Sequence, residues 1–189
     1  MKSILKSVLL FVVLMPSLSF IPQKDGDKIV YDKNKPLVWS DFLGKPDNSS
    51  GTQAYTFSEM SSTCSWMDDS ATINLTRFFD KHKSWVKMDK ANDYLLKHEQ
   101  GHFDLTEIYY RKLVKKLKEY RFTAKTFSTD FNKINSTNSS DLNKEQDLYD
   151  KETNHSIIEL KQKEWDARIA THLKDLEDYT ATKVVVHLH

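Results

Sequence analysis

Residues 95–105 read LLKHEQGHFDL, and the segment His98-Glu99-Gln100-Gly101-His102 within them is the most informative part of the chain. Two histidines four residues apart lie on the same side of a helix, so both imidazoles can bind one metal ion. The glutamate after the first histidine lies beside that ion, where its carboxylate can deprotonate a bound water. This spacing predicts a zinc site with His98 and His102 as ligands and Glu99 as general base.

The residues around this segment predict one amphipathic helix over residues 89–120. Asp89 is a suitable N-cap, and the chain contains no proline from Lys90 to Tyr120. Both histidines belong to a stripe with three- and four-residue spacing, which faces the interior or a cleft. The stripe consists of Ala91, Tyr94, Leu95, His98, His102, Leu105, Tyr109, Leu113 and Leu117. Gly101 costs about 1 kcal/mol against alanine inside a helix, which indicates that another element approaches closely.

The alternative to a metal site is a pair of hydrogen-bonded core histidines on an amphipathic helix, as in an all-helical adaptor. Glu99 favours the metal site, because a carboxylate next to two core histidines would be costly to bury without a partner.

The N-terminus predicts export. Lys2 and Lys6 precede an apolar run at residues 8–15, and the small residues Ser17 and Ser19 follow it. This pattern is typical of a signal peptide over residues 1–19, too short for a comfortable membrane span. We therefore expect a bacterial periplasmic or secreted protein, with no stable membrane insertion after signal cleavage. An uncleaved N-terminal anchor is the alternative.

The composition bears on the partner, the disulfides and the number of domains. The chain has 28 basic and 27 acidic residues, a balance that gives no reason to expect a nucleic acid as partner. The single cysteine, Cys64, cannot form an intrachain disulfide. Residues 20–189 are enough for one domain with a hydrophobic core.

The predicted fold class is α+β, with a small antiparallel sheet packed on two long helices, as in zincin metallopeptidases. Residues 28–80 are rich in strand patterns, from which we expect three or four strands. The strand-like segments are 28–31, 37–39, 54–60, 64–66 and 71–79, with a hairpin turn at 67–70. Residues 127–140 read as a polar connection, residues 141–179 as a second helix, and 183–187 as a short strand.

A catalytic zinc ion needs a third protein ligand and an open position. The next histidine after His102 is His155, on the predicted second helix. At about 1.5 Å per residue, an antiparallel helix pair can bring His155 back to the first two histidines, so we predict His155 as the third zinc ligand. Glu152 is the main alternative ligand. Asp104 and Glu107 are weaker candidates, better suited to orienting the histidine rings.

Several motifs are shared with a known family. The most specific are the segment 95–104 and the pattern Tyr149-Asp150-x-x-Thr153-x-His155, and shorter ones lie at 39–44, 54–56 and 84–86. On these motifs the chain resembles a bacterial family of exported zinc-dependent proteases catalogued as a domain of unknown function. The resemblance implies zinc binding, a peptidase activity and a site that includes the block from Tyr149 to His155. The family often has glycine where this chain has Ser156.

These observations predict a zinc-dependent peptidase that acts on a peptide or protein substrate. Zn²⁺ would lower the pKa of a bound water, and Glu99 would pass the water's proton to the leaving amine. Tyr149 is a candidate donor to the oxyanion, or alternatively a core aromatic residue. Strand 71–79 is expected to offer an exposed edge to an extended peptide. The alternative function is a non-catalytic metal- or partner-binding module of the cell envelope.

Overall fold

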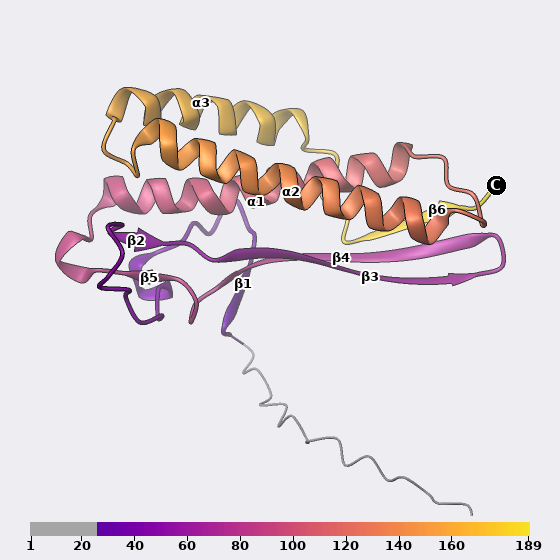
Figure 1. Ribbon diagram of the computed structural model, residues 1–189, viewed down its shortest axis with the longest axis horizontal. Helices are drawn as coiled ribbons and strands as arrows, with labels where there is room; N and C mark the ends of the chain where they lie inside the picture. Colours follow the sequence, from indigo (N-terminus) through magenta and orange to yellow (C-terminus); the bar gives the residue numbers. More distant parts are fainter. Residues whose placement is uncertain (1–25) are drawn as a thin grey trace, which may run out of the picture.

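Residues 26–189 form an antiparallel sheet with three helices on one of its faces (Figure 1). They are the part of the chain that the computed structural model describes, and the predicted signal peptide lies outside them. The predicted α+β class with a small antiparallel sheet is confirmed. Among the residues described, no helix is both long enough and apolar enough to cross a membrane.

A long hairpin of β3 (Ser58–Met67) and β4 (Ser70–Asp80) dominates the sheet, with the predicted turn between the two strands. β4 is central, because β1 (Lys28–Val30) and β6 (Lys183–His187) both pair with its other side. The expectation that strand 71–79 has an exposed edge is therefore wrong. β3 is an edge strand of this sheet.

Two shorter segments depart from the predicted strands. Residues 54–60 divide into β2 (Ala54–Tyr55), which pairs with β5 (Trp85–Val86), and the start of β3. Residues 37–39 form no strand, because the backbone N–H of Leu37 donates to the side chain of Gln100 and the chain then enters the 3₁₀ helix η1 (Trp39–Asp41).

The first long helix, α1 (Asp93–Glu119), carries the histidine motif as predicted but begins later than expected. Its N-cap is Asn92, whose side chain accepts from the backbone N–H of Leu95. Asp89 lies instead in the 3₁₀ helix η2 (Met88–Lys90).

The predicted single helix over 141–179 is wrong, because two helices occupy this part of the chain: α2 (Phe127–Thr153) and α3 (Glu159–Asp175). α2 includes the expected polar connection, since Phe127 and Phe131 pack against the core at helical spacing. It ends where three successive residues take left-handed φ values: Asn154 (49°), His155 (51°) and Ser156 (71°). This backbone conformation cannot continue a right-handed helix.

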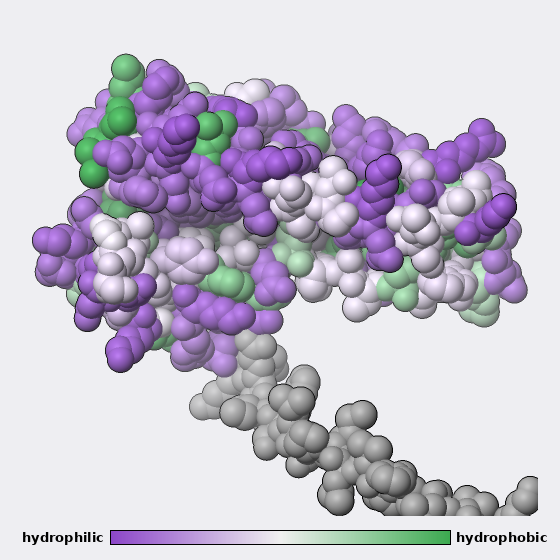
Figure 2. Space-filling model, viewed as in Figure 1, coloured by the Kyte–Doolittle hydropathy of each residue, from purple (hydrophilic) through white to green (hydrophobic). Residues whose placement is uncertain are grey.

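α1 is buried on two sides, which explains its broad apolar stripe. One side packs on the sheet, and the other packs against α2 and α3 (Figure 1). The sheet-side core includes Tyr110, Val114 and Leu117, and the helix-side core includes Leu105 and Ile108. The outer surface of α2 and α3 is mostly hydrophilic (Figure 2). The histidine motif of α1 therefore lies between the segment that leads from β2 into β3 and the C-terminal end of α2.

Candidate metal centre

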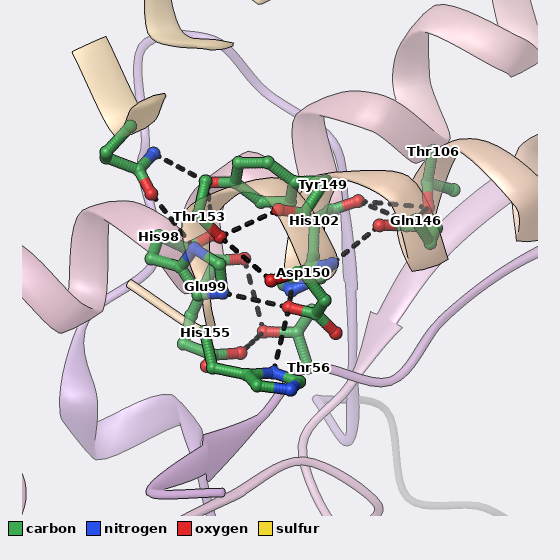
Figure 3. Close-up of polar contacts among 11 residues, drawn as sticks. Thr56, His98, Glu99, His102, Thr106, Gln146, Tyr149, Asp150, Thr153 and His155 are labelled. Carbon is green, nitrogen blue, oxygen red and sulfur yellow. Dashed lines mark hydrogen bonds and ion pairs between the residues drawn. The ribbon is translucent and has the colours of Figure 1, made fainter. Parts of the chain in front are cut away.

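His98 and His102 turn toward a single carboxylate oxygen on α2 (Figure 3). The Nε2 atom of each ring lies 3.1 Å from Oδ1 of Asp150. Within the described part of the chain, these three residues form a group whose ligand atoms all lie within 4.8 Å of one another. The imidazoles of the helical motif and a carboxylate from the facing helix thus converge on one point.

A glutamine orients each imidazole from behind. Oε1 of Gln162 lies 3.0 Å from Nδ1 of His98, and Oε1 of Gln146 lies 2.6 Å from Nδ1 of His102. Because an amide oxygen only accepts hydrogen bonds, both Nδ1 atoms must carry the proton. The Nε2 atom of each neutral ring then presents a lone pair toward Asp150.

Further hydrogen bonds fix which end of each amide faces the ring. Nε2 of Gln162 donates to Oδ1 of Asp166 at 2.8 Å, and Nε2 of Gln146 donates to the backbone carbonyl of His102 at 3.0 Å. A carboxylate and a carbonyl accept but cannot donate, so neither amide can be turned round without losing a bond. The tautomer of both imidazoles follows from this network.

When both imidazoles are neutral, these three atoms are all acceptors and repel one another unless a proton or a metal ion lies between them. Two ligand atoms at about 2.05 Å from a tetrahedral zinc ion are separated by about 3.3 Å. The observed Nε2 to Oδ1 separations of 3.1 Å are close to that value. Two of the three pairwise separations in the group of His98, His102 and Asp150 are therefore close to those of zinc ligands, and the third is at most 4.8 Å.

The site's charges shift two pKa values in opposite directions. Without a metal ion, a protonated imidazole can donate from Nε2 to Asp150. Burial opposes ionisation of Asp150, but hydrogen bonds from His102 and His98 outweigh it and lower the pKa of its carboxyl. Burial likewise opposes protonation of His102, but its hydrogen bond to Asp150 and the nearby charge of Glu99 raise its pKa. Both shifts show that the site attracts positive charge.

Glu99 lies beside the imidazoles at the wall of a cavity of about 330 Å³. Its side chain is buried, and its Oε2 accepts a hydrogen bond of 2.7 Å from the hydroxyl of Thr56. Segment 52–58 forms the opposite wall of the cavity, and Asp150 and His155 also line it. The predicted general base is therefore next to the converging ligand atoms and reaches the cavity.

His155 lies at the mouth of this cavity, half exposed, in the left-handed turn after α2. Its Nδ1 lies 3.3 Å from Oδ1 of Asp150, but it is outside the group whose ligand atoms all lie within 4.8 Å. As a third ligand it would have to move closer to the other two histidines.

Glu152 and Asp104, the other predicted ligands, face away from the histidines. Oε2 of Glu152 accepts from the indole N–H of Trp165 at 2.8 Å. Oδ1 of Asp104 accepts from the side-chain amide of Gln100 at 2.7 Å. Glu107 is likewise turned toward arginines and does not orient either histidine.

Tyr149 is a core residue that shapes the site. Its ring stacks on His98 with centroids 4.6 Å apart, and its hydroxyl donates to the carbonyl of His98 while accepting from Gln162. Burial raises the pKa of this hydroxyl. The hydroxyl proton of Tyr149 is thus used in a hydrogen bond inside the core, and the side chain does not line the cavity. Both observations favour a core aromatic residue over an oxyanion donor.

The predicted close approach at Gly101 is confirmed, and the approaching group is Tyr149. A Cβ at Gly101 would lie 2.9 Å from Cζ of Tyr149 and closer still to its hydroxyl. Glycine in the middle of α1 therefore leaves space for the ring that packs on His98.

Sequence reasoning missed three residues of the site: Asp150, Gln146 and Gln162. Asp150 belongs to the Tyr149–His155 motif, but the sequence did not indicate that its carboxylate lies between the two imidazoles. Nothing in the local sequence marks the two glutamines, because their role depends on how α2 and α3 lie against α1.

This is an α+β protein in which two histidines and a carboxylate from facing helices can hold a metal ion. Residues 51–156, more than half of the chain, match the family described as "Bacterial protein of unknown function (DUF922)", and the chain belongs to this family. The matched region contains the histidine motif and ends just after His155. No curated protein and no solved structure matches the chain.

Proposed function

We propose that this protein is an exported zinc-dependent peptidase. The observation that carries the proposal is the convergence of three lone-pair donors, His98, His102 and Asp150, next to the carboxylate of Glu99 at a cavity wall. A purely structural zinc site is usually closed by four protein ligands, whereas three ligands beside an acid and a cavity suit hydrolysis.

We propose Asp150 as the third ligand, because its oxygen already lies between both imidazoles. His155 is the alternative, supported by its 3.3 Å approach to the same oxygen. With His98, His102 and Asp150 as ligands, the ion would have three protein ligands, the number typical of catalytic zinc sites.

A zinc ion held there would polarise a carbonyl and lower the pKa of a water toward neutrality. Glu99 would take the proton of that water and later deliver it to the leaving amine. The Thr56 hydroxyl holds one oxygen of Glu99, so the other is left to move the proton. Tyr149, Gln162 and Gln146 keep the rings in place, so that little reorganisation is needed during the reaction.

An extended peptide has a backbone partner beside this site. The backbone N–H of Asp80 donates to the carbonyl of Phe57, so in the antiparallel pattern the N–H and C=O of Ser58 point toward the free edge of β3. Ser58 also lines the cavity. A peptide that pairs with this edge would pass close to the histidines. We therefore propose β3, and not strand 71–79, as the edge that binds an extended peptide.

The test compares the zinc-loaded protein with its Glu99→Gln variant on casein and on a quenched peptide library. Glu119→Gln, at the exposed end of α1, is the control. We expect Glu99→Gln to reduce cleavage by about 10²–10⁴-fold while zinc content stays the same.

Zinc binding with equal cleavage, or none, by the wild type and Glu99→Gln would contradict the peptidase and favour a non-catalytic metal-binding module. A protein that binds no zinc after loading would instead assign the histidines to the core.

A further inference from the structure

A second cavity, of about 570 Å³, lies between the loop after β1, the centre of β4 and the end of α3. It shares no lining residue with the cavity beside the histidines. Two arginines line it, Arg77 from β4 and Arg111 from α1, and both side chains are more than nine-tenths buried. Buried arginines at the wall of a cavity are a characteristic feature of sites that bind anions.

Both arginines share one carboxylate. Nε of Arg77 lies 2.6 Å from Oε2 of Glu107, and Nε of Arg111 lies 2.7 Å from Oε1 of the same residue. Glu107 is completely buried, and it balances only one of the two positive charges. The cluster thus keeps one positive charge in a region where an uncompensated charge is costly.

The two guanidinium groups also keep free donors. Each has five N–H groups, and contacts with protein use four of the ten: three to Glu107 and one from Arg111 to the carbonyl of Leu173. Neither guanidinium contains a nitrogen that is both buried and without a partner in the described part of the chain. The nitrogens without a protein acceptor therefore keep some accessible surface, and both arginines line the cavity.

The rim of the cavity adds positive charge. Lys33 and Lys174 line it, and neither forms an ion pair with another residue of the described chain. The lining carries four positive side chains, Lys33, Arg77, Arg111 and Lys174, and three negative ones, Asp32, Glu107 and Glu177. The lining therefore has a formal net charge of +1.

We propose that this cavity binds a small oxyanion, a phosphate or a carboxylate group, on the free N–H groups of Arg77 and Arg111. The planar guanidinium matches the spacing of two oxygens in either group. A bound oxyanion would balance the excess charge and join β4, α1 and the end of α3. This site does not depend on the proposed peptidase activity.

The test uses the full mature chain after removal of metal with EDTA, because phosphate also binds metal ions. Inorganic phosphate and sodium acetate are titrated at constant ionic strength, with chloride as the reference, and binding is measured by calorimetry and by the melting temperature. Lys33→Glu/Lys174→Glu alters the rim and leaves the buried cluster intact. Lys118→Glu/Lys163→Glu, on exposed positions elsewhere, changes the net charge equally.

We expect saturable stabilisation by at least one of the two oxyanions, with affinity reduced at least fivefold in the rim variant and unchanged in the control variant. Two results would overturn the proposal. One is the absence of saturable binding of either oxyanion by the wild type. The other is an equal loss in both variants, which would indicate general charge screening.

Discussion

Nε2 of His102 lies 3.1 Å from Oδ1 of Asp150, although the two residues are 48 positions apart in the chain. His98 makes the same contact from one helical turn away. Both rings donate from Nδ1 to glutamines, so in a neutral ring the Nε2 atom that faces Asp150 is an acceptor. A proton or a metal ion between these atoms removes the repulsion among them.

Removal of the Asp150 carboxylate should weaken zinc binding more than removal of His155. Asp150→Ala takes away a proposed ligand, so we expect a loss of about 100-fold or more, because loss of an outer-shell partner alone costs about 10–100-fold. We expect less than about tenfold for His155→Ala. Competition with a chelator of known affinity measures both, and circular dichroism verifies the fold. A larger loss in His155→Ala would make His155 the third ligand.

The glutamine behind each ring should tune metal affinity without contact with the ion. Gln146→Leu removes the acceptor for Nδ1 of His102, so we expect a loss of about 10–100-fold in zinc affinity. Gln146→Glu keeps an acceptor at that position and should retain most of the affinity. Equal losses in the two variants would show that Gln146 acts only through packing against α1.

Gly101→Ala should destabilise the protein, although alanine is normally about 1 kcal/mol better than glycine inside a helix. The new methyl group would collide with Tyr149, whose hydroxyl is held by His98 and Gln162. We expect a net loss of about 1–3 kcal/mol in the free energy of unfolding, measured with urea.

Gly51→Ala is the control, because a methyl group there meets no atom within 4 Å. An increase in stability for Gly101→Ala would mean that the Tyr149 ring is free to move away.

Asp104 should make stability depend on pH. Burial raises the pKa of its carboxyl from 3.8 to about 6, although hydrogen bonds from Gln100 and Tyr31 oppose the shift. Because the folded pKa lies above the unfolded one, this residue's contribution is most favourable below pH 4 and is lost as the pH rises through about 6. The Asp104→Asn variant has no carboxyl at this position, so its stability does not fall in this pH range through ionisation of residue 104.

We therefore expect the stability of Asp104→Asn relative to the wild type to rise by about 1–3 kcal/mol from pH 4 to pH 7, in metal-free protein unfolded with urea. A constant difference across this range would show that the carboxyl keeps an ordinary pKa in the folded protein.

Local patterns predicted the elements whose residues alternate or recur regularly. The β3–β4 hairpin follows from a two-residue alternation around the turn at Asp68, and α1 follows from a long stripe of helical spacing. The start of α2 was predicted too late because only four of its residues are buried: Phe127, Leu142, Tyr149 and Thr153. Contacts with distant parts of the chain stabilise its polar first half as a helix, and local helix propensity does not predict such contacts.

The break between α2 and α3 has a weak signal in the sequence. No proline or glycine occurs there, and Asn154 is the one residue that readily takes a left-handed conformation. The residues of the site likewise differ in how far the sequence predicts them. His98, Glu99 and His102 follow from spacing within one helix, whereas Asp150 becomes visible only once α2 lies against α1.

The most direct test of the metal centre is zinc X-ray absorption of the loaded protein, with zinc content measured on the same sample. We expect one zinc ion per chain with two imidazole nitrogens at about 2.0–2.1 Å and carboxylate oxygen at about 2.0–2.2 Å, and loss of this spectrum in His98→Ala/His102→Ala. A wild-type protein that holds no zinc, or a spectrum unchanged in the double variant, would contradict the account.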